Sequence, residues 1–349
     1  MYVYAGIDEA GYGPLFGPLT IGRCVLGLAD MPGLADAAAV AADTAPPPMW
    51  SKLRGAVCRT LTGRKGRLPV NDSKKLYSPA TGLRNMELSV LAFAAAAGHR
   101  PATVDAWLDC LGETTHRDLA AMPWYQPCDL RPWATLPTAS TIGELAVARN
   151  LLTTTTGRVG VSVLDMGAAV VFEDRFNRMV TATRSKAAAS YTFVGRHLRH
   201  IWDRFGEHQP QVIVDRQSGR MRYRELLAID FPDAHMTILG EDETRSVYRL
   251  AAGDDRRHTD DRPGHPARAM TVTFVVDADA DHMPVALASM ISKYTRELLM
   301  DRFNAYFTAH APAIKPTAGY AQDATRFWRE IEPMLTQLNI QPNQLRRLA

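Results

Sequence analysis

The sequence predicts an α/β fold built around one mixed β-sheet. Two apolar, β-branched segments at residues 2–7 and 19–27 flank a turn rich in Gly and Pro, which is typical of an early antiparallel hairpin. Later segments alternate between short β-branched runs and long helical patterns, as β–α units do. The chain has 349 residues, of which 46% are hydrophobic, so it can bury a large core. We therefore expect a mixed sheet flanked by helices.

After the hairpin, the first half of the chain is predicted to be mostly helical or irregular. An Ala-rich stretch at 34–43 ends at three prolines, and residues 50–69 begin as a helix and continue as a basic loop. Residues 79–97 are expected to form a long helix, since a proline lies at its start and a glycine follows its end. Residues 100–140 are rich in Trp and Pro, which favours an insertion packed on the rest of the domain.

The second half carries the alternation of strands and helices. We expect two strands around a short turn, at 160–164 and 168–172. A long helix is expected at 173–205, and a strand that ends in an acid at 211–215. A short helix is expected at 221–229 and a strand at 236–240. Residues 246–253 and 269–277 are expected to form a hairpin around a basic loop. Two further helices are expected at 285–307 and 321–338.

The net charge of +3 is too small to indicate a nucleic-acid partner by itself. The charge is unevenly spread, however, because residues 51–71 contain no acid and six basic residues: Lys52, Arg54, Arg59, Arg64, Lys65 and Arg67. For an isolated run of this kind, a solvated loop is the simpler interpretation. Composition alone therefore leaves a nucleic-acid partner open.

The four cysteines indicate neither a disulfide framework nor structural zinc. Cys24, Cys58, Cys110 and Cys128 form no Cys-x-x-Cys pair and have no His at zinc-finger spacing. The first residues lack the basic start and apolar stretch of a signal peptide. No apolar run approaches the length of about 20 residues that crosses a bilayer. We expect reduced thiols, no membrane partner and a cytoplasmic protein.

Acidic residues follow three of the expected strands. They are Asp8 and Glu9 after the first strand, Asp215 after QVIVD, and Asp277, Asp279 or Asp281 after TVTFVV. In open α/β sheets, ligands bind beyond the strand ends. Acids that converge there form an all-oxygen site, which suits Mg²⁺ or Mn²⁺ better than zinc. Acids at strand ends are also common without a ligand, so spacing alone leaves both interpretations open.

The turn after the first strand explains how two adjacent acids share one site. Neighbouring side chains on a regular strand face opposite ways, so Asp8 and Glu9 converge only where the strand breaks. Gly11, Gly13 and Pro14 supply that break. The same glycines let a substrate backbone come close.

Four segments resemble the motifs of type II ribonucleases H, in the same order along the chain. GIDEAGYGPLFGP at 6–18 is similar to the family's opening motif, and NDSKKLYS at 71–78 to its Asp-Ser-Lys-Lys-Leu segment. ALASMISKYTREL at 286–298 resembles the Ala-Ser-Ile-x-Ala-Lys-x-x-Arg-Asp helix, and GYAQDATRF at 319–327 the Gly-Tyr segment that follows it. The regions between these motifs are longer than in a compact member, so the resemblance is to an enlarged, divergent branch.

The resemblance implies a ribonuclease-H-like sheet and two-metal hydrolysis of RNA strands, or of single ribonucleotides, within duplex DNA. Three positions match the family's first three catalytic acids: Asp8, Glu9 and Asp215. The fourth acid is expected fourteen residues before Lys293, which gives Asp279, with Asp281 as the alternative. These acids would hold Mg²⁺ or Mn²⁺, and the products would carry 5′-phosphate and 3′-hydroxyl ends.

Ribose recognition is the first part of substrate binding that the resemblance implies. Backbone groups at Gly11, Tyr12 and Gly13 would lie against the 2′-hydroxyl, which distinguishes RNA from DNA. Tyr320 matches the aromatic that packs on the sugar next to the ribonucleotide, and a core tyrosine beside Pro316 is the alternative. The chain departs from the family at Tyr12, where Arg is usual, because tyrosine offers one hydroxyl and a stacking face instead of a fork of donors. Single-ribonucleotide specificity is therefore left open.

Phosphate binding is the second part that the resemblance implies. Ser73 and Lys74 would hold a flanking phosphate, and Lys293 would support the acids or the substrate backbone. With tyrosine rather than arginine at position 12, the basic loop at 254–268 and the basic run at 52–67 are expected to bind phosphates instead.

Three other functions compete with cleavage of RNA–DNA hybrids or of ribonucleotide-containing duplex DNA. A nuclease of the same fold acting on branched or flapped DNA is one, because Tyr12 weakens the case for ribose recognition. A nucleic-acid-binding protein without turnover is another, although all four acid positions are filled. A metal-dependent phosphatase of small molecules would not need the basic segments.

A single domain over residues 1–349 is expected, with insertions at about 28–70, 100–158 and 241–270. The sequence contains no fixed-period repeat. It gives no clear signal for an oligomer, so a monomer is the expectation.

Overall fold

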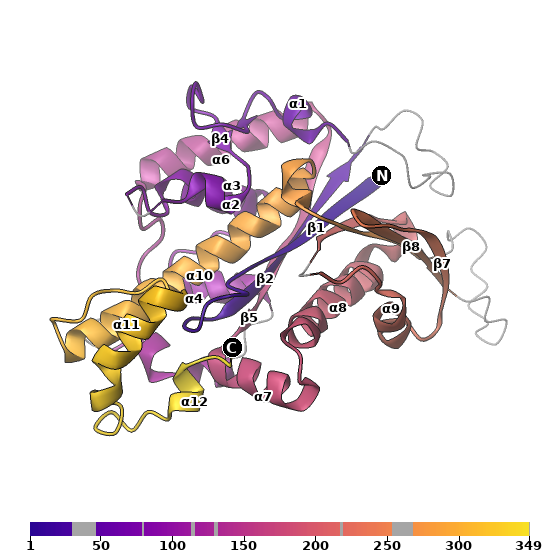
Figure 1. Ribbon diagram of the computed structural model, residues 1–349. Coiled ribbons are helices and arrows are strands. Elements are labelled where there is room, and N and C mark those ends of the chain that lie inside the picture. The colour runs from indigo at the N-terminus through magenta and orange to yellow at the C-terminus, as the bar shows by residue number, and fades with distance from the viewer. Residues whose placement is uncertain are drawn as a thin grey trace.

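The computed structural model describes residues 1–29, 47–78, 80–112, 116–128, 132–216, 219–252 and 268–348. Within these ranges the chain forms a seven-stranded mixed β-sheet with helices on both faces (Figure 1), so the predicted fold class is confirmed. The strands, in order across the sheet, are β5 (Val161–Val171), β2 (Leu19–Leu28), β1 (Tyr2–Ala10), β6 (Gln211–Asp215), β9 (Ala269–Val275), β8 (Arg245–Ala252) and β7 (Ala234–Glu241). Two short strands, β3 (Val57–Cys58) and β4 (Leu68–Pro69), form a separate parallel pair.

Three neighbouring strands at the centre of the sheet run parallel to one another. β6 lies between β1 and β9 and pairs with both in parallel. The remaining pairs of this sheet are antiparallel, including the predicted β8–β9 hairpin. The register sets Ile7 beside Val214 and Asp215 beside Val275, so the residues that follow these strands emerge at one level of one edge. This topology brings the acids after β1, β6 and β9 together.

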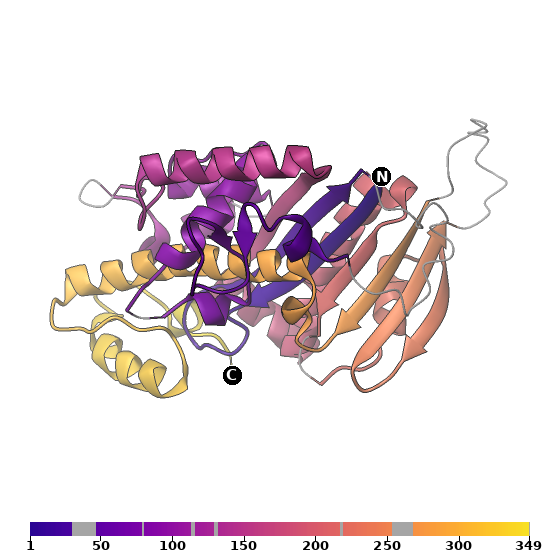
Figure 2. The same cartoon turned by 90° about the horizontal axis from the view of Figure 1, so that it is seen from above.

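Helix α10 (Met283–His310) runs along one face of the sheet, close to β1 and β2 (Figures 1 and 2). Two glycines permit the approach: a Cβ on Gly6 would stand 2.2 Å from the helix backbone, and one on Gly22 would stand 2.5 Å from it. The Ser292 hydroxyl of α10 donates a hydrogen bond to the backbone oxygen of Asp8 at 3.0 Å. The predicted helix at 285–307 is therefore confirmed, and it is attached to the end of β1.

Helices α7 (Glu173–Thr183), α8 (Lys186–Phe205) and α9 (Arg224–Asp230) cover the opposite face. The prediction of one helix over 173–205 is wrong. The chain breaks because Arg184 adopts a left-handed φ of 53°. The Ser185 hydroxyl then caps α8 by accepting a hydrogen bond from the Ala188 N–H at 3.2 Å.

Strand β5 is continuous, so the prediction of two strands at 160–164 and 168–172 is wrong. The apparent turn between them is a bulge beside Asp165, opposite Val25 of β2. Asp165 is buried and accepts a hydrogen bond from Arg23 Nε at 2.7 Å. The polar signal in the middle of this segment therefore marks a buried ion pair rather than a turn.

Of the remaining helices, some were not predicted and others end at different residues than predicted. Helix α6 (Ile142–Arg158) is absent from the predicted elements, although Thr141 and Glu144 form a capping box at its start. The predicted helix at 321–338 ends at Ile331, where a 3₁₀ turn with a proline follows. The others are α1 (Met49–Lys52), α2 (Ser73–Leu76), α3 (Arg84–Ala96), α4 (Val104–Leu111), α5 (His116–Ala120), α11 (Ala321–Ile331) and α12 (Pro342–Leu345).

The Trp- and Pro-rich stretch packs on the rest of the chain, as predicted. Trp107 and Trp124 are buried, and the Trp107 indole donates a hydrogen bond to the Thr295 hydroxyl of α10 at 3.0 Å. The Ala-rich stretch at 34–43 and nearly all of the basic loop at 254–268 lie outside the described residues.

All four cysteines lie in described parts of the chain and are free thiols. None of the helices in those parts combines the length and the apolar character needed to cross a bilayer.

A buried carboxylate stands where α7 begins. Glu173 is fully buried, and its Oε1 accepts hydrogen bonds from the Tyr125 hydroxyl at 2.7 Å and from the Gly17 N–H at 3.1 Å. Burial raises the pKa of Glu173 to about 7, and these hydrogen bonds and the Arg347 charge limit the shift. The folded protein thus holds a proton that the unfolded chain releases near pH 4.5.

Replacing Glu173 by Gln is expected to change how stability depends on pH. The raised pKa stabilises the native state fully below about pH 4.5, and this contribution is lost as the pH rises to about 7. The wild-type free energy of unfolding should therefore fall relative to that of E173Q, with a slope approaching 1.4 kcal/mol per pH unit. Urea unfolding between pH 5 and 8 measures the slope, and the exposed-site variant E332Q is the control. Equal slopes for wild type and E173Q would contradict the prediction.

Candidate active site

A cavity of about 290 Å³ opens where β1, β6 and β9 end. Every residue that the sequence assigns to the site lines this cavity: Asp8, Glu9, Gly11, Tyr12, Gly13, Ser73, Lys74, Asp215, Asp279, Lys293 and Tyr320. These residues come from segments far apart in the sequence. The topology of the sheet and the course of α10 bring them together.

Asp8 is the most enclosed of the acids. It is only 7% exposed, and its Oδ1 accepts a hydrogen bond from the Glu9 N–H at 2.7 Å. Burial raises its pKa well above the ordinary range, and the charges of Glu9 and Asp215 raise it further. The hydrogen bond from the Glu9 N–H opposes this shift without cancelling it. The site therefore favours a proton or a cation beside Asp8.

The acids after β6 and β9 show the same effect. Burial raises the pKa of Asp215 to about 6, and the charges of Asp279 and Asp277 add to the shift. The Ala278 N–H donates a hydrogen bond to Asp215 Oδ1 at 2.9 Å and opposes it. The pKa of Asp279 is also raised, first by burial and then by the charge of Asp72. Carboxylates from three strands thus share one field of negative charge.

Two lysines line the cavity in different ways. Burial alone would lower the pKa of Lys74, but Asp72, Asp8 and Asp279 together raise it above the ordinary value, so its ammonium lies in the field of the acids. Lys293 Nζ instead donates to Glu297 Oε1 at 2.7 Å and stands 4.4 Å from the centre of the Tyr77 ring. Lys293 is therefore held on its own helix rather than among the acids.

The start of α2 places Ser73 and Lys74 at the edge of the cavity. Asp72 caps this helix by accepting a hydrogen bond from the Lys74 N–H at 2.9 Å. The Ser73 side chain is buried and accepts a hydrogen bond from the Ser289 hydroxyl of α10 at 3.1 Å. The segment is therefore fixed to the same helix that holds the end of β1.

Two buried arginines hold the turn that follows β1. Arg296 of α10 is 1% exposed and donates to the Phe16 carbonyl at 3.0 Å. Arg347, near the end of the chain, is 3% exposed and donates to the Tyr12 carbonyl at 3.0 Å and to the Pro14 carbonyl at 2.9 Å. Burial lowers the pKa of Arg347 to about 10, so it is still charged at neutral pH. The turn is thus supported by charged donors rather than by its own glycines and prolines alone.

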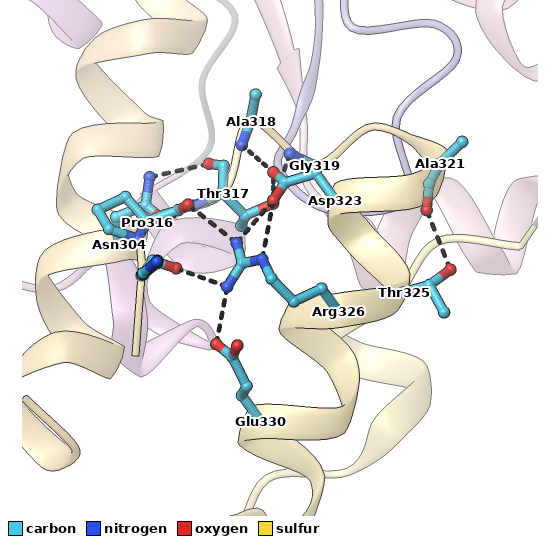
Figure 3. A network of polar contacts seen from close by, with 11 residues as sticks. Asn304, Pro316, Thr317, Ala318, Gly319, Ala321, Asp323, Thr325, Arg326 and Glu330 are labelled. Atoms are coloured by element: carbon cyan, nitrogen blue, oxygen red, sulfur yellow. Dashed lines mark hydrogen bonds and ion pairs between the residues drawn. The ribbon is translucent and has the colours of Figure 1, made fainter. Parts of the chain in front are cut away.

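Tyr320 follows a loop, residues 315–319, that a polar network holds in place (Figure 3). Asp323 accepts hydrogen bonds from the Thr317 hydroxyl at 2.6 Å and from the next backbone N–H at 2.9 Å. Asn304 of α10 bonds both backbone groups of Thr317, at 2.8 and 2.9 Å. Tyr320 is 48% exposed on the wall of the cavity, so the core-tyrosine alternative is wrong.

The structure separates the two alternatives for the acid after β9. Asp279 lines the cavity with the other acids, whereas Asp281 lines a different cavity. The cavity also holds Asp277, one of the acids expected after this strand, and two polar residues that the sequence did not indicate, Asp72 and Ser289. Asp72 is the N-cap of α2, which accounts for an aspartate at this place in the sequence. It also lies close enough to Asp279 for its charge to raise the pKa of that carboxyl.

The donors present suit a hard divalent cation, because they are carboxylate oxygens without sulfur or imidazole nearby in the cavity lining. Within the ranges that the structure describes, no three acidic, His or Cys side chains stand in an arrangement that could hold a metal ion. Oxygen donors are the ligands that Mg²⁺ and Mn²⁺ prefer, but among the described residues the carboxylates as they stand do not form a ligand set.

No family model and no curated protein matches the sequence. Among solved structures, the chain is similar to RNase HII from Archaeoglobus fulgidus, solved in complex with PCNA, with 15% identity over 99% of this chain and 93% of that chain and a TM-score of 0.37. Ribonuclease H2 from Pyrococcus horikoshii OT3 gives 14% identity, 98% and 92% coverage, and a TM-score of 0.34. Bst-RNase HIII in complex with Mn²⁺ is 12% identical, with 99% of this chain and 66% of that chain covered and a TM-score of 0.37.

Gly11 and Gly13 are expected to respond very differently to a methyl group. Gly11 has φ +84°, and a Cβ there would stand 2.5 Å from Arg296 Nε, whereas nothing lies within 4 Å of a Cβ on Gly13. G11A should lower the free energy of unfolding by about 2 kcal/mol. G13A should leave it within about 0.5 kcal/mol of wild type. Urea unfolding of both variants measures this, and equal destabilisation would contradict the described support of the turn.

Proposed function

We propose that the protein is a metal-dependent endonuclease that hydrolyses RNA strands paired to DNA, or ribonucleotides embedded in duplex DNA. The observation that carries the proposal is the convergence of Asp8, Glu9, Asp215 and Asp279 from three parallel strand ends in one cavity. Four segments of the chain, at 6–18, 71–78, 286–298 and 319–327, resemble motifs of type II ribonucleases H in the same order.

The four acids would hold Mg²⁺ or Mn²⁺. Bound there, the cations would activate a water molecule and stabilise the leaving 3′ oxygen. The raised pKa values of Asp8 and Asp215 support this role, because a group of crowded carboxylates is relieved by positive charge. The expected products carry 5′-phosphate and 3′-hydroxyl ends.

The chain's own residues would bind and orient the substrate around that centre. Lys74 stands at an exposed edge of the cavity within the field of the acids, where it would bind a phosphate flanking the cut, next to Ser73. Open space around Gly13 lets a sugar-phosphate backbone come close to the turn. Tyr320, also on the cavity wall, would pack on the neighbouring sugar. Lys293 would act through Glu297 and the helix rather than on the acids.

A nuclease of the same fold that acts on structured DNA is the second candidate. Tyr12 favours it, because this residue offers the cavity one phenol instead of the guanidinium usual in the family and its ring packs against the apolar cluster of β1 and α8. A binder without turnover and a small-molecule phosphatase are the remaining alternatives. The cleavage assay separates the binder from the proposal, and a phosphatase of small molecules would neither cut the hybrids nor need the basic segments.

Cleavage of three end-labelled duplexes tests the function directly. One duplex carries a single ribonucleotide, one an RNA strand paired to DNA, and one is all DNA. In Mg²⁺ or Mn²⁺, wild type should cut only the ribonucleotide-bearing duplexes. D8N should lower the rate by about 10³-fold or more while still binding, because it removes a carboxylate from the centre and keeps the size of the side chain.

Each other outcome of this assay identifies a competing function. A branched or flapped all-DNA duplex is added as a fourth substrate, and cutting of it alone would support the second candidate. Binding of the hybrids without cleavage in either metal would support a binder. Cleavage that survives D8N would place the active centre elsewhere and overturn the proposal.

Charge removal in the basic segment is expected to weaken hybrid binding in a salt-dependent way. R64Q/K65Q should reduce the magnitude of the slope of log affinity against log salt concentration by about 1 for each phosphate that is no longer neutralised. The double variant R178A/R329A, which removes two exposed arginines from α7 and α11, is the control. Filter binding between about 50 and 300 mM salt measures the slopes. If R64Q/K65Q binds like wild type, the segment at 52–67 does not contact the substrate.

A further inference from the structure

A second cavity, of about 460 Å³, lies beside the acidic one. Its lining includes Pro47, Trp50 and Arg59 from the segment before β4, and Asp281 and His282 from the turn after β9. Asp279 lines the first cavity, and two residues on along the same turn Asp281 lines the second. Consecutive Cα atoms are about 3.8 Å apart, so these two aspartates are separated by at most about 7.6 Å at their Cα atoms. The two cavities are neighbours across one turn.

Trp50 and Arg59 form a flat platform in this cavity. The Arg59 guanidinium lies over the Trp50 ring, 4.5 Å from its centre, and also donates a hydrogen bond to the Ala280 carbonyl. The Trp50 indole donates to the Val70 carbonyl at 2.8 Å. Both planar groups are therefore held before any ligand arrives, which lowers the entropic cost of stacking on them.

The platform is also tied to the phosphate-binding edge of the first cavity. The Asn71 side-chain amide donates to the Arg59 carbonyl at 2.7 Å, and the Asn71 carboxamide oxygen accepts from the Asp72 N–H at 2.9 Å. The residues that follow are Ser73 and Lys74. A ligand on the platform would therefore keep a defined position relative to a phosphate bound at Lys74.

The polar groups beside the platform favour a nucleobase over a phosphate. The exposed Asp281 carboxylate repels a phosphate but accepts a hydrogen bond from an exocyclic amino group. The Tyr4 hydroxyl bonds Nδ1 of His282 at 2.5 Å, so this contact leaves the other ring nitrogen, Nε2, unused. An aromatic ring, a guanidinium plane and edge groups for hydrogen bonds are the means by which proteins bind unstacked bases.

We infer that this second cavity binds one unpaired nucleobase of the substrate, one or two nucleotides from the scissile phosphate. The inference rests on the proposed function, since it takes the phosphate at the first cavity as its reference point. Taking a base out of a duplex costs free energy, and an unpaired nucleotide avoids that cost. The protein should therefore prefer hybrids in which a nucleotide next to the cleavage position is unpaired.

Abasic scanning tests the inference through binding rather than cleavage. The D8N protein is titrated with a series of hybrids in which one nucleotide at a time, from three before to three after the cut, lacks its base. Removal of the base at one position on one side should weaken binding by about tenfold, and removal elsewhere should change it less than about twofold. A mismatched nucleotide at the sensitive position should instead strengthen binding, because its base is already unpaired.

Variants of the platform make the test specific. In R59A/D8N the sensitive position should no longer matter, because the platform lacks its guanidinium. R59K/D8N keeps the charge without the plane and should behave like R59A/D8N. R178A/D8N removes an exposed arginine of α7 that lines neither cavity, and it should scan like D8N alone. Circular dichroism melting confirms that the variants are folded.

The outcomes separate this inference from the proposed function. If wild type cuts hybrids but the scan shows no sensitive position, the inference fails and the proposed function stands. If a sensitive position exists but persists in R59A/D8N, the base binds elsewhere and the inference also fails. If wild type cuts no ribonucleotide-bearing duplex in either metal, the proposed function fails first.

Discussion

Like charges crowded at one edge of the sheet are the constraint on which the rest of this structure depends. β1, β6 and β9 end side by side, so their acids cannot avoid one another, and burial adds to the cost of ionising them. The fold tolerates this because hydrogen-bond donors are aimed at the carboxylates: the Glu9 N–H at Asp8 and the Ala278 N–H at Asp215. The relief is incomplete, as the raised pKa values show, so positive charge at this edge would lower the cost of ionising these acids.

Helix α10 connects this electrostatic centre to the packing of the molecule. Its backbone meets β1 and β2 at glycines, its Ser292 bonds the end of β1, and its Arg296 supports the turn that follows. Asn304 of the same helix holds the loop before Tyr320 (Figure 3). One rigid element thus sets the relative positions of the acids, the turn and the aromatic wall. Charged donors from the end of the chain, through Arg347, complete the support of the turn.

Local sequence patterns predicted most of the helices and strands. They failed where the structure at a polar residue depends on contacts or backbone conformations that the pattern does not show. Asp165 appears in the sequence as part of a turn, yet it lies in a continuous strand because Arg23 of the neighbouring strand neutralises it. Ser185 marks a helix start in the middle of a long helical pattern, and the break depends on one residue in a left-handed conformation. Neither outcome follows from periodicity, because periodicity carries no information about which distant side chain will pair with a polar group.

For the site, the sequence by itself determined the residue types: acids after strands, a turn rich in glycine and proline, and a basic segment. The tertiary structure decided which of these meet. Asp279 lines the cavity with the other acids, whereas Asp281 lines the neighbouring cavity. Tyr320 is exposed in the lining of the first cavity, and Lys293 forms an ion pair with Glu297. The physical reason is that identity and spacing fix the chemistry a side chain offers. The direction in which that side chain points depends on strand register and on the path of one helix across the sheet.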